Sequence, residues 1–132
     1  MKVDSSSIIA EGDVSLLVDT AKDVGSSLAR QLTTSQIRNI FGEVRRIQMN
    51  WPAGATKEKA DAAFRGVVLL QPKLAYQAKR ERGGGVEELK LALNPCIDEI
   101  RKAPEDKRHL YFTRFVDFFE AILAYHKAAG GN

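Results

Sequence analysis

The stretch "PEDKRHLYFTRFVDFFEAILAYHKAAGG", residues 104–131, decides the fold class. Its opening Pro104 and its closing Gly130 and Gly131 are typical of the two ends of one α-helix. Its aromatic and aliphatic side chains cover nearly half of the helix circumference, which is more than one buried stripe requires. The sequence therefore predicts a helix at the centre of a bundle, or one that also meets a second molecule.

Other segments repeat apolar residues at the spacing of a helix. Asp13, Thr33 and Thr56 can each cap a helix that follows. Thr33 and Gln36 form a capping-box pattern, in which each side chain bonds the backbone N–H of the other residue. Because no stretch shows the alternation of a strand, the sequence predicts an all-α fold, a single compact bundle of about five or six helices.

The chain length predicts the domain organisation. We expect one helical domain over residues 1–132, which is long enough to bury a core without disulfides or metal. Residues 1–10 should be frayed, and the glycines 83–85 should form a flexible break. Pro72 should kink its helix rather than end it, and Pro95 should break or kink a second helix.

The cysteine count and the N-terminus predict the compartment. Cys96 is the only cysteine, so no internal disulfide can form. The start "MKVDSSSIIAEGD" has neither the apolar core of a signal peptide nor an Arg-rich transit pattern. No apolar run approaches the roughly 20 residues that a membrane span needs. We therefore expect a cytoplasmic protein with no membrane partner.

Positive charge is concentrated in the middle of the chain. The formal net charge is +3, but the segment from Arg38 to Arg82 has 10 basic and 4 acidic residues, a net charge of +6. The rest of the chain therefore carries −3. A basic surface of this kind is typical of proteins that bind polyphosphate backbones, although a lysine-rich helix face is often only solvated.

The stretch "QPKLAYQAKRERGGG", residues 71–85, contains the densest basic cluster. At about 100° per residue, Lys73, Tyr76 and Arg80 lie on the side of a helix away from the core. The cluster is therefore predicted to be a displayed face with a tyrosine ring in its middle. The three glycines lack the spacing of a phosphate-binding loop.

The segment "TTSQIRNIFGEVRRIQ", residues 33–48, carries a second group of basic residues. On the same helical wheel, Arg38 and Arg45 lie beside each other at the edge of the apolar stripe, whereas Arg46 points directly away from it.

No combination of residues forms a recognisable catalytic or metal site. His109 and His126 are 17 positions apart, far from the i, i+4 spacing of a helical zinc pair. His126 falls on the apolar face and is expected to be a core or interface histidine rather than a ligand. Cys96 has no cation beside it in sequence, so we expect a small buried apolar residue. We predict no enzyme and no cofactor.

Three blocks of the chain carry a resemblance to a known family. They are "LTTSQIRNIFGEVRRIQ" (32–48), "LLQPKLAYQAKR" (69–80) and "FTRFVDFFEAILAYHK" (112–127). In this order they resemble the small subunit of type III-A CRISPR effector complexes, the Csm complex. The chain departs from the pattern at Lys79, where a glycine is expected, and at Gln71, where a basic residue is expected.

The resemblance implies a non-catalytic, RNA-binding helical subunit of an antiviral ribonucleoprotein. Several copies would stack along the guide RNA and its target RNA, beside the other subunits of the complex. Phosphate contacts without sequence preference suit a site that must accept every guide.

We carry the phosphate-contacting role over to seven basic residues. They are Lys73, Lys79, Arg80 and Arg82, with Arg38, Arg45 and Arg46 as a companion patch. Tyr76 has two interpretations, a ring that covers a helix junction and a ring that stacks on a base. Trp51, beside a proline, is expected to plug the core rather than to stack on a base.

The apolar arc of the last helix is expected to have two roles, because a subunit that stacks on its own copies needs an exposed apolar patch. Its centre should build the core, through Phe112, Phe115, Phe119 and Ile122. At its margins, some of the four residues Tyr111, Phe118, Tyr125 and His126 should serve self-association or a neighbouring subunit.

Two other functions remain open from the sequence. The chain could be a protein-binding adaptor without nucleic-acid binding, using the aromatic face of its last helix. It could also be a helix-turn-helix DNA binder with residues 33–46 as the recognition helix, which would need side chains that reach base edges. Strong salt dependence without sequence preference would separate RNA backbone binding from both.

Overall fold

The computed structural model describes residues 3–81 and 83–132. Within these ranges the chain forms five α-helices, a short π-helix and one 3-10 turn, and no strand. The prediction of an all-α helical bundle is therefore confirmed. The elements are η1 (Ser6–Ala10), α1 (Val14–Leu28), α2 (Thr34–Met49), α3 (Lys57–Arg80), α4 (Gly85–Lys102), η2 (Glu105–Lys107) and α5 (Arg108–Ala128).

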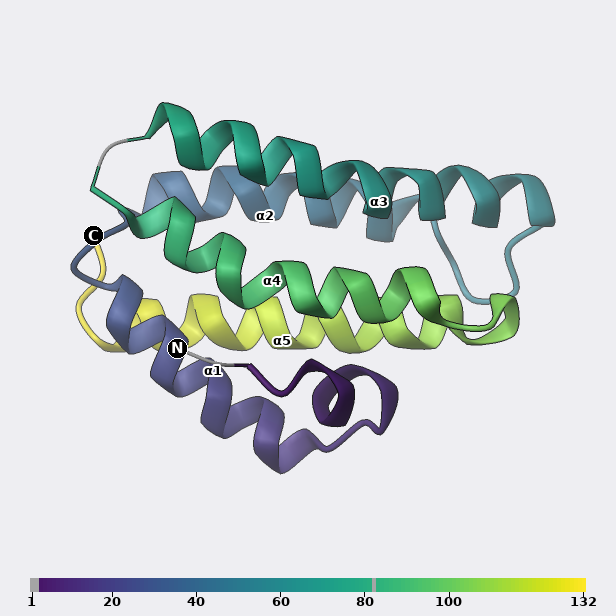
Figure 1. Ribbon diagram of the computed structural model, residues 1–132, viewed down its shortest axis with the longest axis horizontal. Coiled ribbons are helices and arrows are strands. Elements are labelled where there is room, and N and C mark those ends of the chain that lie inside the picture. Colours follow the sequence, from purple (N-terminus) through teal and green to yellow (C-terminus); the bar gives the residue numbers. More distant parts are fainter. Residues whose placement is uncertain (1–2, 82) are drawn as a thin grey trace.

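The helices are arranged around α5 (Figure 1). In this view α2 and α3 lie on one side of the molecule, α4 and α5 run through the middle, and α1 lies on the other side. The helix α5 packs against α1, α2, α4 and η1. Its predicted place at the centre of the bundle is confirmed. None of the described helices is both long and apolar enough to span a membrane.

The wide apolar arc of α5 is used inside the chain. Phe112, Phe115, Phe119 and Ile122 are buried in the core, as predicted. Phe118 is also fully buried, so its expected place at an interface with another subunit is wrong. The reason is that α1 covers one flank of α5 while α2 and α4 cover others, so that even the margin of the arc meets the same chain.

His126 is likewise buried in the core, with 1% of its surface exposed. Its Nε2 lies 2.7 Å from the carbonyl oxygen of Leu32. The chain then turns back over the ring, and the Gly131 N–H donates to the carbonyl of His126 over 2.9 Å. Gly131 lies so close to the ring that a Cβ at this position would collide with the imidazole. His126 is thus a core histidine, and its expected contact with another subunit is wrong.

Of residues 1–10, which were expected to be frayed, residues 1–2 lie outside the described residues and the others are described as follows. Residues Ser6–Ala10 form η1, and Ile8 and Ile9 are fully buried. The Arg114 guanidinium of α5 donates to the carbonyl oxygens of Ile9 at 2.9 Å and Ala10 at 3.1 Å. The two buried isoleucines hold this serine-rich segment on the core. The Arg114 side chain also satisfies carbonyl groups at the end of η1 that have no helical partner.

The predicted helix starts are confirmed. The side chains of Asp13, Thr33 and Thr56 each accept a backbone N–H at the start of α1, α2 and α3. Thr33 and Gln36 form both bonds of the capping box. The prolines do not end their helices, since α3 continues through Pro72 and α4 through Pro95.

The glycines before α4 have distinct structural roles. Gly83 and Gly84 have φ angles of +98° and +81°, which only glycine adopts without strain. Gly85 begins α4 and is buried. It lies so close to Gln31 that an added Cβ would be 2.7 Å from the Gln31 carbonyl oxygen. The flexibility of this break stays a prediction.

Candidate nucleic-acid interface

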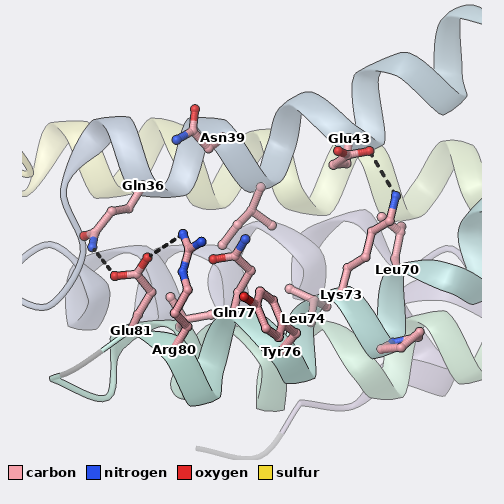
Figure 2. Close-up of a pocket in the computed structure, with 13 residues that line it drawn as sticks. Gln36, Asn39, Glu43, Leu70, Lys73, Leu74, Tyr76, Gln77, Arg80 and Glu81 are labelled. Carbon is pink, nitrogen blue, oxygen red and sulfur yellow. Dashed lines mark hydrogen bonds and ion pairs between the residues drawn. The ribbon is translucent and has the colours of Figure 1, made fainter.

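A cleft of about 570 Å³ opens between α2 and α3 (Figure 2). Leu70 and Leu74 of α3 are buried beneath it, and Ile40 of α2 is half-buried. Polar side chains of both helices line the cleft, and they are Gln36, Asn39, Glu43, Lys73, Tyr76, Gln77, Arg80 and Glu81.

The helix α3 presents its basic residues to solvent, as predicted. Leu70 and Leu74 are four residues apart and hold one face of α3 in the core. Lys73, Tyr76 and Arg80 lie on the other side and are exposed. Tyr76 is 62% exposed, and the Arg80 guanidinium lies 5.8 Å from the centroid of its ring.

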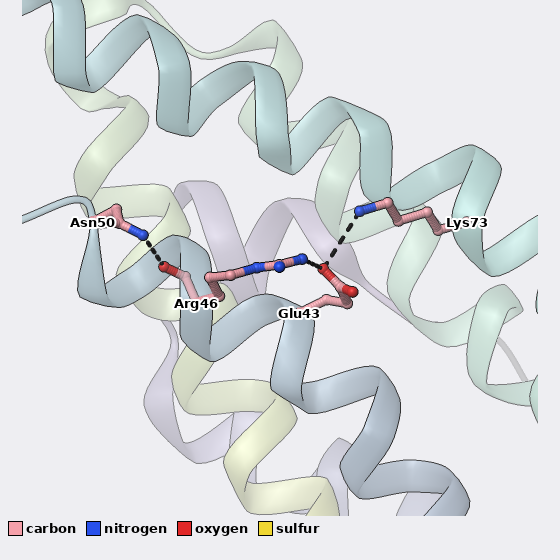
Figure 3. Close-up of polar contacts among 4 residues, drawn as sticks. All are labelled: Glu43, Arg46, Asn50 and Lys73. Carbon is pink, nitrogen blue, oxygen red and sulfur yellow. Dashed lines mark hydrogen bonds and ion pairs between the residues drawn. The ribbon is translucent and has the colours of Figure 1, made fainter.

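Two basic residues from different helices converge on one carboxylate (Figure 3). Lys73 Nζ of α3 lies 3.4 Å from Glu43 Oε2, and Arg46 of α2 pairs with the same oxygen. Asn50 Nδ2 donates to the Arg46 carbonyl over 2.9 Å at the end of α2. Glu43 therefore holds Arg46 and Lys73 together at one end of the cleft.

The charges around Glu43 change its protonation. Burial by itself raises the pKa of the Glu43 carboxyl, but the hydrogen bonds from Arg46 and Lys73, with their charges, outweigh burial and lower the pKa. Glu43 is thus ionised near neutral pH and offsets part of the positive charge of this face.

A second carboxylate lies at the other end of the cleft. Glu81 Oε1 lies 3.3 Å from Arg80 NH2, and Gln36 Nε2 donates to Glu81 Oε2 over 3.3 Å. The hydrogen bond to Glu81 raises the pKa of Arg80, which keeps the guanidinium charged. Each end of the cleft therefore holds a basic residue against an internal acid.

The expected companion patch is divided between two faces of α2. Arg46 pairs with Glu43 at the end of the cleft and lines a neighbouring groove of about 550 Å³, whereas Arg45 NH1 lies 3.6 Å from Glu120 Oε1 of α5. Arg38 lines a smaller cleft of about 230 Å³ with Leu123 and Lys127 of α5. The helical wheel separated Arg46 from Arg38 and Arg45. In the structure, Arg38 and Arg45 lie beside α5, whereas Arg46 pairs with Glu43.

The end of α3 holds the other predicted basic residues. Lys79 is exposed on its last turn. Arg82 lies outside the described residues. The sequence analysis did not predict that the acids Glu43 and Glu81 belong to the site. Glu43 is 30 positions from Lys73, so no local pattern links Glu43 to Lys73.

Other candidate residues take structural places. Trp51 is buried and stacks on Phe112 with 5.2 Å between ring centroids, which confirms the prediction of a plug. His109 Nε2 lies 3.0 Å from the Trp51 carbonyl oxygen. Cys96 is fully buried, as predicted, and burial raises the pKa of its thiol. In residues 3–81 and 83–132 no group of His, Cys, Asp or Glu is placed to hold a metal ion.

Comparison with known families and proteins identifies the chain. The family model described as Csm2 Type III-A matches residues 11–132, which include all of the cleft and every basic residue of the predicted site. Comparisons with curated proteins and with solved structures found no match. The chain belongs to the Csm2 Type III-A family, and with it to the small subunits of the type III-A CRISPR effector complex, the Csm complex.

Proposed function

We propose that the chain is a non-catalytic RNA-binding subunit that contacts the phosphate backbone of the guide RNA and target RNA through the α2–α3 cleft, and that several copies stack along this RNA. The observation that carries the proposal is the convergence of Arg46 of α2 and Lys73 of α3 on Glu43, at one end of the α2–α3 cleft. Arg80 extends the positive surface two turns further along α3.

The spacing of the basic residues suits a strand of nucleic acid. Lys73 and Arg80 are seven residues apart, which is about 10 Å along a helix axis. The rise between nucleotides of one strand is about 3.4 Å in DNA. The two side chains would therefore contact different phosphates of one backbone.

The internal acids occupy the places that phosphates would take. Glu43 and Glu81 pair with basic residues at sites open to solvent, where ion pairs contribute about 0–1 kcal/mol. A phosphate forms charge-assisted hydrogen bonds of the same kind and can replace a carboxylate at small cost. The four described basic residues of this face, Arg46, Lys73, Lys79 and Arg80, still exceed the two acids by two charges.

Tyr76 is proposed to contact RNA rather than to cover a helix junction. Most of its ring is exposed at the cleft wall beside Arg80. An exposed ring next to a cation can stack on a base at the end of a duplex or in a single strand. Such stacking is tolerant of sequence, as a subunit that accepts every guide requires.

The alternative functions have less support. The adaptor hypothesis needs an exposed aromatic face on α5, yet Phe112, Phe118 and Phe119 are buried within the chain. The helix-turn-helix hypothesis needs α2 in a major groove, yet Ile37 and Val44 hold α2 in the core and Arg45 pairs with α5.

The test compares RNA binding by two double variants. One carries Lys73→Ala and Arg80→Ala. The control carries Lys102→Ala and Lys107→Ala, which removes two exposed charges outside the cleft. In filter binding to a guide–target RNA duplex, the slope of log affinity against log salt should become shallower by about 0.7 to 0.9 for each lost contact. The control should keep the slope. An unchanged slope in the cleft variant would exclude these residues.

Sequence preference gives a second test. Unrelated RNA duplexes of equal length should bind the free chain with equal affinity, micromolar or weaker, because a lone subunit offers few contacts. Tight preference for one sequence would instead favour a specific reader. Co-purification of guide RNA and larger subunits with the tagged chain would test the proposed partners.

A further inference from the structure

We propose that Gln77 is the residue through which the α2–α3 cleft distinguishes RNA from DNA, by hydrogen bonding to a ribose 2′-hydroxyl. The inference rests on the proposed function, because it assigns a sugar contact to the same cleft. Gln77 is uncharged and takes no part in the proposed phosphate contacts.

Gln77 lies between the two basic residues of α3 that line the cleft (Figure 2). It is four residues after Lys73 and three residues before Arg80. Side chains at these spacings are neighbours on one face of a helix. A strand whose phosphates met Lys73 and Arg80 would therefore bring the sugars between those phosphates beside Gln77.

Three amide side chains line the cleft, and they differ in what they already bind. Gln36 uses both of its polar atoms, since Oε1 accepts a backbone N–H of the capping box over 2.9 Å and Nε2 donates to Glu81 over 3.3 Å. Asn39 is exposed at the rim, where water satisfies its amide. Gln77 is half-buried, and in the part of the chain that the structure describes no protein group bonds to its side chain.

The Gln77 amide is open to the cleft rather than sealed in the core. Among the described residues, the buried side-chain atoms that lack a hydrogen-bond partner are Asn94 Oδ1 and Arg108 Nε, and neither residue lines this cleft. The amide therefore reaches solvent and can meet a ligand. It offers an acceptor oxygen and two donor hydrogens, and a 2′-hydroxyl likewise both donates and accepts.

The ribose hydroxyl is a better partner for this amide than a base edge. Every nucleotide of RNA carries the same hydroxyl, so the contact suits a subunit that accepts every guide, whereas base edges differ with sequence. DNA has no hydroxyl at this position and would leave the half-buried amide without a partner. A polar group left unpaired in this way makes a site reject the ligand that lacks the hydroxyl.

The test compares two short guide–target RNA duplexes of one sequence, the first with ribose throughout and the second with 2′-fluoro sugars throughout. The 2′-fluoro sugars keep the A-form helix and every phosphate but remove the hydroxyl donor. The variant Gln77→Met keeps a long, unbranched side chain that favours a helix and removes the amide. The control Gln48→Met makes the same change at a half-buried glutamine of α2 outside the cleft.

The native chain should bind the ribose duplex about 2- to 10-fold more tightly than the 2′-fluoro duplex, as one neutral hydrogen bond contributes. Gln77→Met should remove this difference, and Gln48→Met should keep it. The slope of log affinity against log salt should be the same for both duplexes and for Gln77→Met, because the phosphate contacts of Lys73 and Arg80 remain.

Three results would overturn the inference while leaving RNA binding in place. They are equal affinity of the native chain for the two duplexes, a preference for ribose that survives in Gln77→Met, and an equal loss of affinity for both duplexes in that variant, which would put Gln77 on a phosphate. A chain that binds neither duplex in a salt-dependent way would instead contradict the proposed function, and the inference with it.

Discussion

The contact between α1 and α5 is close, whereas the contact between α2 and α3 is open. Where α1 meets α5, Gly25 lies against the α5 backbone, so close that a Cβ added to it would lie 2.7 Å from the Ile122 carbonyl oxygen. Ala21, Val24 and Leu28 of α1 are fully buried. Where α2 meets α3, two clefts open and the Lys73–Glu43 ion pair bridges the helices. The close contact stabilises the fold, and the open contact leaves polar side chains available to a partner.

The largest expected effect is the loss of apolar packing in α1. Leu28→Ala should lower the free energy of unfolding by about 2–5 kcal/mol, because Leu28 is fully buried. Leu69→Ala is the matched change in α3, where the side chain is 41% exposed, and should cost about 1 kcal/mol or less. Urea denaturation of both variants measures the difference. Equal losses would show that the two contacts are equally close-packed.

A smaller effect of either sign is expected from two glycine-to-alanine changes. Gly25→Ala should destabilise the chain by about 1–3 kcal/mol, because the added methyl group meets the backbone of α5, which cannot move aside. Gly42→Ala in α2 should instead stabilise it by up to about 1 kcal/mol, since nothing lies within 4 Å and alanine favours a helix. Thermal unfolding should therefore shift in opposite directions. A stabilised Gly25→Ala would contradict the close contact.

The smallest expected effect on stability concerns Glu43. Glu43→Gln should change the free energy of unfolding by less than about 1 kcal/mol, because the ion pairs are open to solvent. The same variant should bind RNA more tightly, since Arg46 and Lys73 lose an internal competitor. Weaker RNA binding would mean that Glu43 orients these side chains rather than competing for them.

The pH dependence of this variant follows from the lowered pKa of Glu43. A carboxyl whose pKa is lower in the folded than in the unfolded chain stabilises the fold when it is ionised. For Glu43 this stabilisation is complete above the ordinary carboxyl pKa of about 4.5 and is lost as the pH falls through the lower pKa of the folded state. The stability difference between the native chain and Glu43→Gln should therefore be present near neutral pH and should shrink below about pH 4.5. A difference that grows on acidification would contradict the assigned pairing.

The sequence by itself determined the helices and the displayed face. Capping side chains act within one turn and apolar spacing acts within one helix, so the starts at Asp13, Thr33 and Thr56 were predictable. The exposure of Lys73 and Arg80 followed from the same wheel. The three sequence blocks also pointed to the family whose model matches residues 11–132.

Only the tertiary structure decided which neighbours cover each face. A helical wheel shows that Phe118 and His126 lie near an apolar arc, but it does not show that α1 and the returning C-terminal residues cover them. It separates Arg46 from Arg45 without showing that the first meets Glu43 and Lys73 and the second meets Glu120. Periodicity records the local rotation of each helix, whereas burial and charge pairing depend on segments far apart in the chain that the packing of the core brings together.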